Sequence, residues 1–470
     1  MIFQKFEDIN LKNYPVIIFG SGPAGMTIAL ELERKKISSL LIEAGQEEYS
    51  DDSQDFYNGK IIGDDIANLS SSRLRQLGGT SGLWGGWSKP IEDYNLKDWL
   101  ITKKELNKYS DKTCSILNIK KEFNKAKINK YFNQIQFQYS NVRFADKYKQ
   151  HIKKSKNIHL ILNCQLSHFD GKNNNVESAI CISNNSLKKI KSKFFVLACG
   201  GIENSRILLW TKVKSKELIN SNLPIGQYWM NHPWIISGIG VINKKKLKQK
   251  LKNSYIDYDG PLHFAAKENL LKERKILSAG IYMNAKEDTK FYKEIIKDIL
   301  CIAPEYGKKI AHKVFKKDLK CGNIFMNIEE PADKNNKIIL DSFEKDKFNI
   351  PRVNLHYKQS KKSLYTAKMF LEEFANLCRT EDIGRIALKE NIYNLETFEN
   401  MGGYHHLGGT RIGNNKLTSV VNSSLKIHDM KNLFISGSSN FPTGGYTNPT
   451  YTIIQMALRL ADNLTNELNK

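Results

Sequence analysis

The start of the chain pairs two short apolar runs with an amphipathic segment between them. Residues 15–20 are apolar and end in glycine, and residues 26–36 carry apolar side chains at helical spacing with basic residues at the end. Residues 38–45 form the second apolar run. Continuous apolar runs bounded by glycine are typical of buried parallel strands. The pattern therefore predicts a strand, a helix and a second strand in succession.

The same kind of pattern returns later in the chain. From residue 156, short β-like runs alternate with Asn, Gly and Ser turns, and they end in a predicted strand and helix over residues 193–210. Residues 432–439 read as another buried strand, and Pro449 opens a predicted helix through Leu460. The Gly- and Trp-rich stretch at 77–90 has no regular period, so we expect a loop there.

Length and composition indicate a soluble protein of enzyme size. The chain has 470 residues, 40% of them hydrophobic, and no run of apolar residues is long enough for a membrane span. No export signal is visible at the start. The seven cysteines are scattered without a CxxC pair, and the histidines have no metal-ligand spacing, so we expect neither disulfides nor a metal. A reducing cytoplasm fits best.

The net charge of +23 raises nucleic acid or an anionic surface as partners. The excess consists of 61 Lys against 11 Arg, interleaved with Asn along the whole chain. A Lys/Asn codon bias accounts for this distribution, and no nucleic-acid partner is expected. Two segments, 243–252 and 291–320, are unusually basic and leave open a peripheral membrane contact.

A glycine-rich motif sits between the first predicted strand and helix. It reads Gly20-Ser21-Gly22-Pro23-Ala24-Gly25, and Glu43 ends the second strand 18 residues after Gly25. Glycines at these positions allow the backbone to approach a pyrophosphate at a helix N-terminus, while the carboxylate accepts hydrogen bonds from a ribose diol. The segment therefore predicts a dinucleotide site.

Several separated motifs resemble the glucose-methanol-choline (GMC) flavin oxidoreductases, nearest to the pyranose oxidase-like branch. GPAG with LLIEAG is similar to the FAD-binding start of that family, LGGTSGLWGG to its loop over the flavin ring, and FVLACGGIENSRILL to its second nucleotide-contacting turn. PIGQYWMNHP resembles a loop near its active site, and HHLGGTRIG with the run to NPTYTIIQMALRLADNL is the most specific match.

The resemblance implies an α/β fold and a division of the chain. Residues 1–95, 156–235 and 400–470 would form a discontinuous, Rossmann-type FAD-binding domain. Residues 96–155 and 236–399 would form an inserted α+β substrate-binding domain with a mostly antiparallel sheet.

The resemblance also implies catalytic residues. The base that takes the hydroxyl proton falls on His406, and its partner falls on Asn448, which can hold the substrate oxygen but does not titrate. Neighbouring His405 is expected to point elsewhere. Backbone N–H groups at the helix start after Asn448 would stabilise negative charge on a reduced flavin.

The cofactor expected from the resemblance is FAD. The pyranose oxidase branch attaches its flavin through a histidine in the loop over the ring, but Leu83 occupies that position here, so the FAD is expected to be non-covalent. The residues expected to bind it are Gly20, Gly22, Pro23, Ala24, Gly25, Glu43, Ala44, Gly78, Gly79, Thr80, Ser81, Trp84, Gly85, Gly86, Gly200, Gly437, Ser438, Pro449 and Thr450.

The resulting functional hypothesis is oxidation of a CH–OH group of a sugar or related polyol, by hydride transfer to flavin N5. The electron acceptor, whether oxygen, a quinone or a carrier, stays open. Two alternatives remain: a membrane-surface FAD dehydrogenase that passes electrons to a quinone or carrier, and an RNA-associated flavoprotein.

Overall fold

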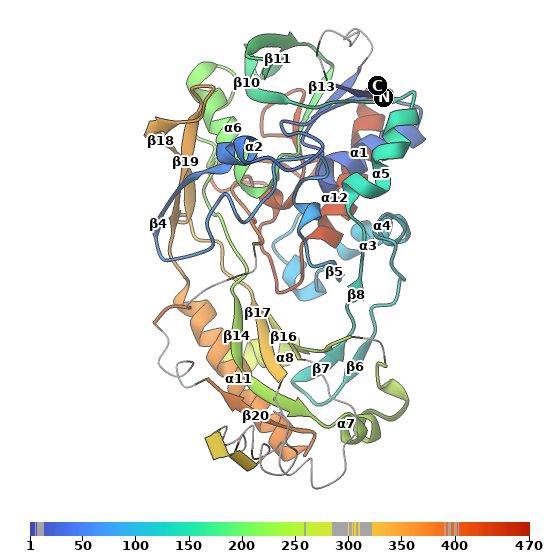
Figure 1. Ribbon diagram of the computed structural model, residues 1–470, viewed down its shortest axis with the longest axis vertical. Helices are drawn as coiled ribbons and strands as arrows, with labels where there is room; N and C mark the ends of the chain where they lie inside the picture. Colours follow the sequence, from blue (N-terminus) through green and yellow to red (C-terminus); the bar gives the residue numbers. More distant parts are fainter. Residues whose placement is uncertain are drawn as a thin grey trace.

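The chain folds into two parts stacked along its long axis, with both ends in the upper part (Figure 1). The computed structural model describes residues 1–4, 14–257, 260–283, 322–389 and 404–470, together with isolated residues between these ranges.

The upper part is built on a six-stranded sheet in which every neighbouring pair of strands is parallel. In spatial order its strands are β1 (Ile2–Phe3), β9 (Ile158–Ile161), β3 (Ser39–Ile42), β2 (Val16–Phe19), β13 (Phe194–Leu197) and β21 (Leu433–Ile435). All residues of β2, β3 and β13 are buried. Strands covered on both faces need continuous apolar runs, which explains why the sequence pattern located them.

Three helices of this part follow strands of the parallel sheet. They are α1 (Pro23–Arg34), α6 (Gly200–Lys214) and α12 (Thr450–Leu468). Helices α1 and α12 pack against each other, and α6 packs against β10 (Cys164–Lys172). The predicted strand, helix and strand at the start of the chain are confirmed, and the predicted C-terminal helix begins beside Pro449 but continues beyond Leu460.

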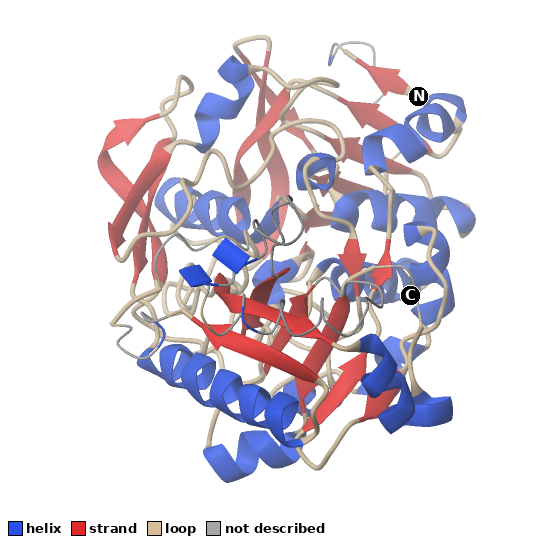
Figure 2. Cartoon of the chain, turned by 60° about the horizontal axis from the view of Figure 1, so that its bottom comes forward, coloured by secondary structure: helices blue, strands red, loops and turns tan. Residues whose placement is uncertain are grey.

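The lower part contains a seven-stranded sheet in which all pairs are antiparallel. In spatial order its strands are β20 (Gly384–Leu388), β14 (Trp234–Ile242), β17 (Gly322–Ile328), β16 (Ala279–Met283), β15 (Leu262–Ala266), β7 (Phe132–Ile135) and β6 (Lys125–Lys127). Helix α11 (Lys361–Thr380) runs beside this sheet (Figure 2). Its Phe370 and Phe374 make ring contacts with Phe132 of β7. The mostly antiparallel sheet expected from the sequence is therefore present.

A third sheet joins distant segments of the chain. Strand β4 (Gly59–Gly63) pairs in parallel with β19 (Pro351–Tyr357), which pairs with β18 (Lys337–Lys345). Both β18 and β19 fall within residues 236–399, yet they contact α6 of the upper part. Part of the expected insertion thus packs on α6, a helix of the part that carries the glycine motif.

The remaining elements are short or lie at the edges. A further antiparallel sheet contains β10, β11 (Asn175–Ser183) and β12 (Ser186–Ile190), and β5 (Trp87–Ser88) pairs with β8 (Gln138–Tyr139). The stretch expected as a loop at 77–90 holds one helical turn, Gly79–Gly82, before β5. Within the described residues, the other α-helices are α2 (Asp51–Gln54), α3 (Lys103–Asn107), α4 (Ser110–Leu117), α5 (Phe144–Lys154), α7 (Lys244–Leu251) and α8 (Glu268–Arg274).

Of the two basic segments, 243–252 is described by the structure and 291–320 is described only at isolated positions. Helix α7 covers most of 243–252, and its Lys246, Lys248 and Lys250 form ion pairs with nearby acidic side chains. Apart from isolated positions, 291–320 lies outside the described residues. Among the described helices, none combines the length and the apolar character that crossing a bilayer would need.

Candidate active site

The glycine motif forms a tight turn between β2 and α1. Gly20 has a φ of +99°, a conformation that side chains rarely adopt. A Cβ on Gly25 would lie 1.9 Å from the carbonyl oxygen of Gly20, so only glycine lets the first turn of α1 pack on the end of β2. Gly22, by contrast, has no atom within 4 Å of its Cβ position. The turn therefore packs tightly against protein at Gly25 and leaves open space at Gly22.

Glu43, after the last residue of β3, lies beside this turn and is hydrogen-bonded to it. Its carboxylate accepts hydrogen bonds from the backbone N–H of Ser21 at 3.0 Å and from the Ser21 hydroxyl at 2.6 Å. The backbone N–H of Gly45 donates a third at 2.8 Å. The acidic side chain is thereby fixed at the carboxyl edge of the parallel sheet.

A cavity of about 540 Å³ opens over the turn. The wall includes the ends of β2 and β3, the residues directly after β13, the loop before β5, the start of β10 and the starts of α6 and α12. The expected site residues that line it are His406, Asn448, Gly20, Gly22, Pro23, Ala24, Glu43, Ala44, Gly79, Thr80, Ser81, Trp84, Gly85, Gly200, Gly437, Ser438, Pro449 and Thr450.

Three expected residues, Gly25, Gly78 and Gly86, are not among the cavity-lining residues. A Cβ on Gly78 would lie 2.7 Å from the backbone nitrogen of Ala145, and one on Gly86 would lie 2.2 Å from the carbonyl oxygen of Ser140. All three glycines are therefore required by packing within the protein.

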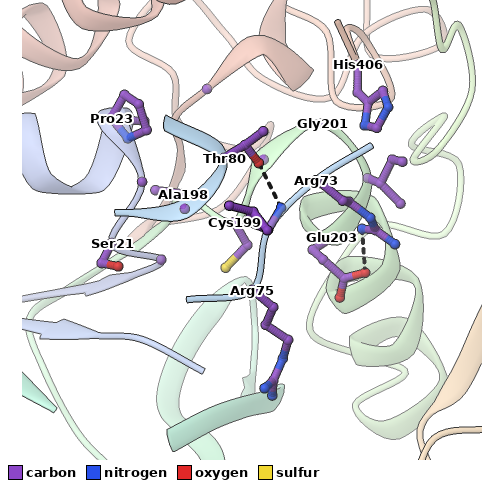
Figure 3. Close-up of a pocket in the computed structure, with 18 of the residues that line it drawn as sticks. Ser21, Pro23, Arg73, Arg75, Thr80, Ala198, Cys199, Gly201, Glu203 and His406 are labelled. Atoms are coloured by element: carbon purple, nitrogen blue, oxygen red, sulfur yellow. Dashed lines mark hydrogen bonds and ion pairs between the residues drawn. The ribbon is translucent and has the colours of Figure 1, made fainter. Parts of the chain in front are cut away.

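The cavity also has a charged wall that the motifs did not indicate (Figure 3). Arg73 donates a hydrogen bond to Glu203 at 2.9 Å and two more to backbone carbonyls. Arg206, one turn after Glu203 on α6, pairs with Glu203 at 3.2 Å and with Asp346 at 2.6 Å. The spacing of Glu203 and Arg206 was visible in the sequence, but their partners come from segments more than 100 residues away.

A third arginine, Arg75, lines the same cavity. Arg75 donates to the hydroxyl of Ser53 at 2.8 Å and to the side-chain oxygen of Gln165 at 2.6 Å. Its guanidinium stacks over the ring of Phe56, 4.1 Å from the centroid. Because Arg73, Arg75 and Arg206 are buried and hydrogen-bonded to protein groups, their positions are fixed before any ligand binds.

His406 enters the cavity from the segment before β21. The carbonyl oxygen of His406 accepts a hydrogen bond from the Ser438 hydroxyl at 2.6 Å, and its ring lies 5.7 Å from the ring of Trp229. A Cβ on Gly201 would collide with the His406 backbone at 2.2 Å, so α6 approaches closely only because glycine stands there. Burial, Arg73 and His405 together lower the pKa of His406 to about 3.

His405 lines the same cavity, contrary to the expectation that it would point elsewhere. Its ring Nδ1 lies 3.0 Å from Nδ1 of His232, and its backbone N–H donates to the side-chain oxygen of Asn231 at 3.2 Å. Burial lowers the pKa of His405 to about 4. Since successive side chains of an extended segment usually diverge, the sequence alone gave no sign of this placement.

Asn448 and Leu83 complete the parts of the site for which the sequence made specific predictions. Asn448 lines the cavity directly before Pro449 and the start of α12. Leu83 is a cavity-lining residue with 63% of its surface exposed. In the described part of the chain, no cluster of His, Cys, Asp and Glu could hold a metal ion.

Fold and cavity define a mixed α/β protein in which a glycine-rich turn on a parallel sheet faces a pair of histidines. Residues 331–457 match the family model described as GMC oxidoreductase. This match confirms the resemblance found in the sequence: the chain is related to the GMC oxidoreductases.

Comparison with characterised proteins gives relatives of moderate similarity. The chain is 24% identical over 284 residues to the fructose dehydrogenase large subunit of Gluconobacter japonicus, covering 60% of this chain and 49% of that protein. It is 24% identical over 286 residues to the 2-methyl-1,2-propanediol dehydrogenase of Mycolicibacterium austroafricanum, with the same coverage. It is 25% identical over 151 residues to the pyranose 2-oxidase of Lyophyllum shimeji, covering 29% of this chain and 21% of that protein. The chain thus spans about half the length of the first two relatives.

Solved structures share the whole fold at low sequence identity. Pyridoxine 4-oxidase from Mesorbium loti superposes with a TM-score of 0.60 at 14% identity, over 97% of this chain and 99% of that one. A formate oxidase variant from Aspergillus oryzae RIB40 superposes with a TM-score of 0.58 at 12% identity, over 97% and 98%. At these identities the likeness shows the mixed α/β fold alone.

Proposed function

We propose that the chain is an FAD-dependent oxidoreductase that oxidises a CH–OH group of a sugar or related polyol. In this proposal the parallel sheet is a Rossmann-type FAD-binding domain, and the expected cavity-lining residues hold the dinucleotide. The observation that carries the proposal is the presence of His406 and the glycine turn on the walls of one cavity.

The cavity fits a dinucleotide because its glycines leave open space on the ligand side. A Cβ added to Gly22, Gly85 or Gly200 would meet no protein atom within 4 Å, although each residue lines the cavity. Packing does not explain glycine at these positions, and a positive φ explains it only at Gly200. Glycine at Gly22 and Gly85 permits the backbone to approach a bound group closely. Glu43 would accept hydrogen bonds from the ribose, and the start of α1 would face the pyrophosphate.

A flavin bound here would supply the hydride-accepting centre for alcohol oxidation. His406 would accept the hydroxyl proton, and Asn448 would hold the substrate oxygen by hydrogen bonding. A base must be unprotonated before the reaction begins. The low pKa of His406, about 3, keeps the ring neutral at neutral pH, and burial and Arg73 are its main causes.

The start of α12 would act on the cofactor rather than on the substrate. Pro449 and Thr450 line the cavity, and the first N–H groups of a helix lack partners within the helix. They would stabilise negative charge on the reduced cofactor.

The substrate class rests on the names of the relatives. Fructose dehydrogenase, 2-methyl-1,2-propanediol dehydrogenase and pyranose 2-oxidase are named for a sugar, a diol and a sugar. The three names include both dehydrogenases and an oxidase, so they favour no single electron acceptor. The FAD is expected to be non-covalent, because Leu83 stands at the position of the linking histidine in the pyranose oxidase branch.

An anaerobic screen of the purified holoprotein tests this function. Sugars, polyols and simple alcohols are added in turn while the visible absorbance of the flavin is followed, and at least one is expected to bleach it. Reoxidation by oxygen, a quinone or cytochrome then identifies the acceptor. The proposal is overturned if dithionite reduces the flavin and none of the hydroxyl compounds does.

The attachment of the flavin is tested on the same preparation. Acid precipitation is expected to release the flavin into the supernatant. Flavin that stays in the washed protein pellet would contradict the non-covalent assignment.

A further inference from the structure

His405 and His232 form a pair of rings joined at one nitrogen each. The two Nδ1 atoms are 3.0 Å apart, and the rings meet edge to face at an interplanar angle of 89°. A hydrogen bond between two ring nitrogens requires that one carries the proton and the other a lone pair. The position of that single proton determines what His405 presents to the cavity.

The surroundings of His232 favour one arrangement. His232 is fully buried, and burial and His405 lower its pKa well below the ordinary value, so its ring is neutral. Its Nε2 lies against the backbone of Gly444, whose carbonyl favours a proton on this nitrogen although the contact falls outside ordinary hydrogen-bond geometry. A neutral ring protonated at Nε2 carries its lone pair at Nδ1.

The proton position in His232 determines the proton position in His405, because the two rings are in contact through their Nδ1 atoms. If Nδ1 of His232 accepts, Nδ1 of His405 must donate. A neutral His405 then has its lone pair on Nε2, the nitrogen on the far side of the ring from His232. Because His405 lines the cavity, that lone pair is available to a ligand there.

The segments that carry the pair are joined to each other and to Glu330 by hydrogen bonds. Asn231, next to His232, accepts a hydrogen bond from the backbone N–H of His405 at 3.2 Å. The backbone N–H of Asn231 donates to the carboxyl of Glu330 at 2.9 Å, and the hydroxyl of Tyr357 bonds the other oxygen of Glu330 at 2.7 Å. The bridge between Met230 and Leu407 runs alongside. These contacts fix the backbone of His405 relative to Asn231 and His232.

We propose that His232 holds His405 with an unprotonated Nε2 facing the cavity, where it accepts a hydrogen bond from a second hydroxyl of the substrate. This inference rests on the proposed function, in which His406 takes the proton of the hydroxyl that is oxidised. The two adjacent histidines in the cavity would then each bind one hydroxyl of the same substrate molecule. His405 becomes the residue that distinguishes a diol or sugar from a simple alcohol, and His232 positions it.

The first test observes the tautomer and needs no turnover. The holoprotein is labelled with 15N-histidine, and the His405 signals are assigned by comparison with His405→Gln. At neutral pH we expect a protonated Nδ1 and an unprotonated Nε2 in His405. A protonated Nε2 would overturn the proposal, whatever the enzyme oxidises.

The second test compares matched substrates with and without the second hydroxyl. The pair is 1,2-propanediol and 1-propanol, or the best sugar of the anaerobic screen and its deoxy analogue. In His405→Phe we expect kcat/KM for the diol or sugar to fall about tenfold relative to the other member, which is the size of one lost hydrogen bond. His405→Gln retains an acceptor and should recover part of the preference.

The controls separate positioning from folding. His428 is buried and bonded to Ser419 but does not line the cavity, so His428→Gln should leave the preference unchanged. His232→Phe removes the acceptor for Nδ1 of His405 and should reduce the preference by an intermediate factor, with flavin content as the check on folding. Equal losses for both substrates in His405→Phe, or no loss, would overturn the proposal. Failure of the proposed function is distinct, because then no hydroxyl compound bleaches the wild-type flavin.

Discussion

The two ends of the cavity are lined by different kinds of groups. At the end formed by the glycine turn, the wall is largely backbone: Gly20 and Gly22 line it, and the side chain of Glu43 is fixed by hydrogen bonds from Ser21 of the turn and from the backbone of Gly45. At the other end the wall includes the ionisable side chains of His405, His406 and Arg73, and the partners of His405 and Arg73 lie far away in the sequence.

The difference reflects what each end has to do. A backbone wall recognises a shared part of a cofactor by shape and by N–H groups, and it tolerates no added side chain. A side-chain wall can hold a proton at a chosen atom, but each group needs partners that compensate for its burial. Substitutions should therefore remove the cofactor at the first end and change the chemistry at the second.

The largest effect is expected from Gly25→Ala. Its Cβ would lie 1.9 Å from the carbonyl oxygen of Gly20, so the turn cannot keep its shape. We expect loss of bound flavin and a clear decrease in Tm, measured by the flavin-to-protein absorbance ratio and by thermal unfolding.

Gly22→Ala is the matched control, because no protein atom lies within 4 Å of its Cβ position. It should fold with the Tm of the flavin-free wild type and bind flavin more weakly. Wild-type flavin content and Tm in Gly25→Ala would show that the turn is not built as described.

The next largest effect is expected from His406→Gln. Removal of a general base typically slows the chemical step by about 10² to 10⁴. The rate of anaerobic flavin reduction should fall in this range while flavin content stays unchanged, as measured by stopped-flow absorbance. His428→Gln serves as the control, since its ring is buried away from the cavity. Reduction of the flavin at the wild-type rate in His406→Gln would remove His406 from the mechanism.

A smaller effect, on stability, is expected from Glu330→Gln. Burial raises the pKa of Glu330 to about 8, so the folded protein binds a proton that the unfolded chain releases above its ordinary pKa. This group's contribution to wild-type stability is therefore lost as pH rises from about 4.5 to 8, by at most about 1.4 kcal/mol per pH unit.

Glutamine does not titrate: its side-chain oxygen can accept from the backbone N–H of Asn231, and its amide nitrogen can donate to the hydroxyl oxygen of Tyr357, which reverses that hydrogen bond. Relative to wild type, the urea midpoint of Glu330→Gln should increase between pH 5 and pH 8. A difference that is constant over this range would mean that Glu330 is ionised in the folded protein.

The smallest effect is expected from pH itself on the proposed base. Because burial and Arg73 lower the pKa of His406 to about 3, the ring stays unprotonated well below neutral pH. We expect kcat/KM to stay level from neutral pH down to about pH 5. A histidine of ordinary pKa would lose about tenfold per unit below about 6.5. A decrease with a midpoint near that value would show that the charged wall does not act on His406.

Much of the upper part could be predicted from the sequence, because its signals are local. The strands β2, β3 and β13 are buried on both faces and therefore appear as unbroken apolar runs, and the turn at Gly20 needs glycine whatever lies around it. The start of the C-terminal helix was indicated in the sequence by Pro449. For the same reason the expected residues around these elements line the cavity.

Other features depended on contacts between segments that are distant in the chain. Gly25, Gly78 and Gly86 belong to the same motifs, yet they contact protein and do not line the cavity, and local sequence cannot distinguish the two uses of glycine. The pairing of β19 with β4 brings residues 351–357 beside 59–63.

The histidine end of the cavity shows most clearly which features the sequence alone could not predict. The HxxGT pattern selected His406, but nothing near it indicated that His405 would meet His232, 173 residues away. Local sequence determines backbone conformation, so it determined the cofactor turn. Only the tertiary structure decided which side chains are buried together, and burial with a particular partner is what sets the proton of each histidine.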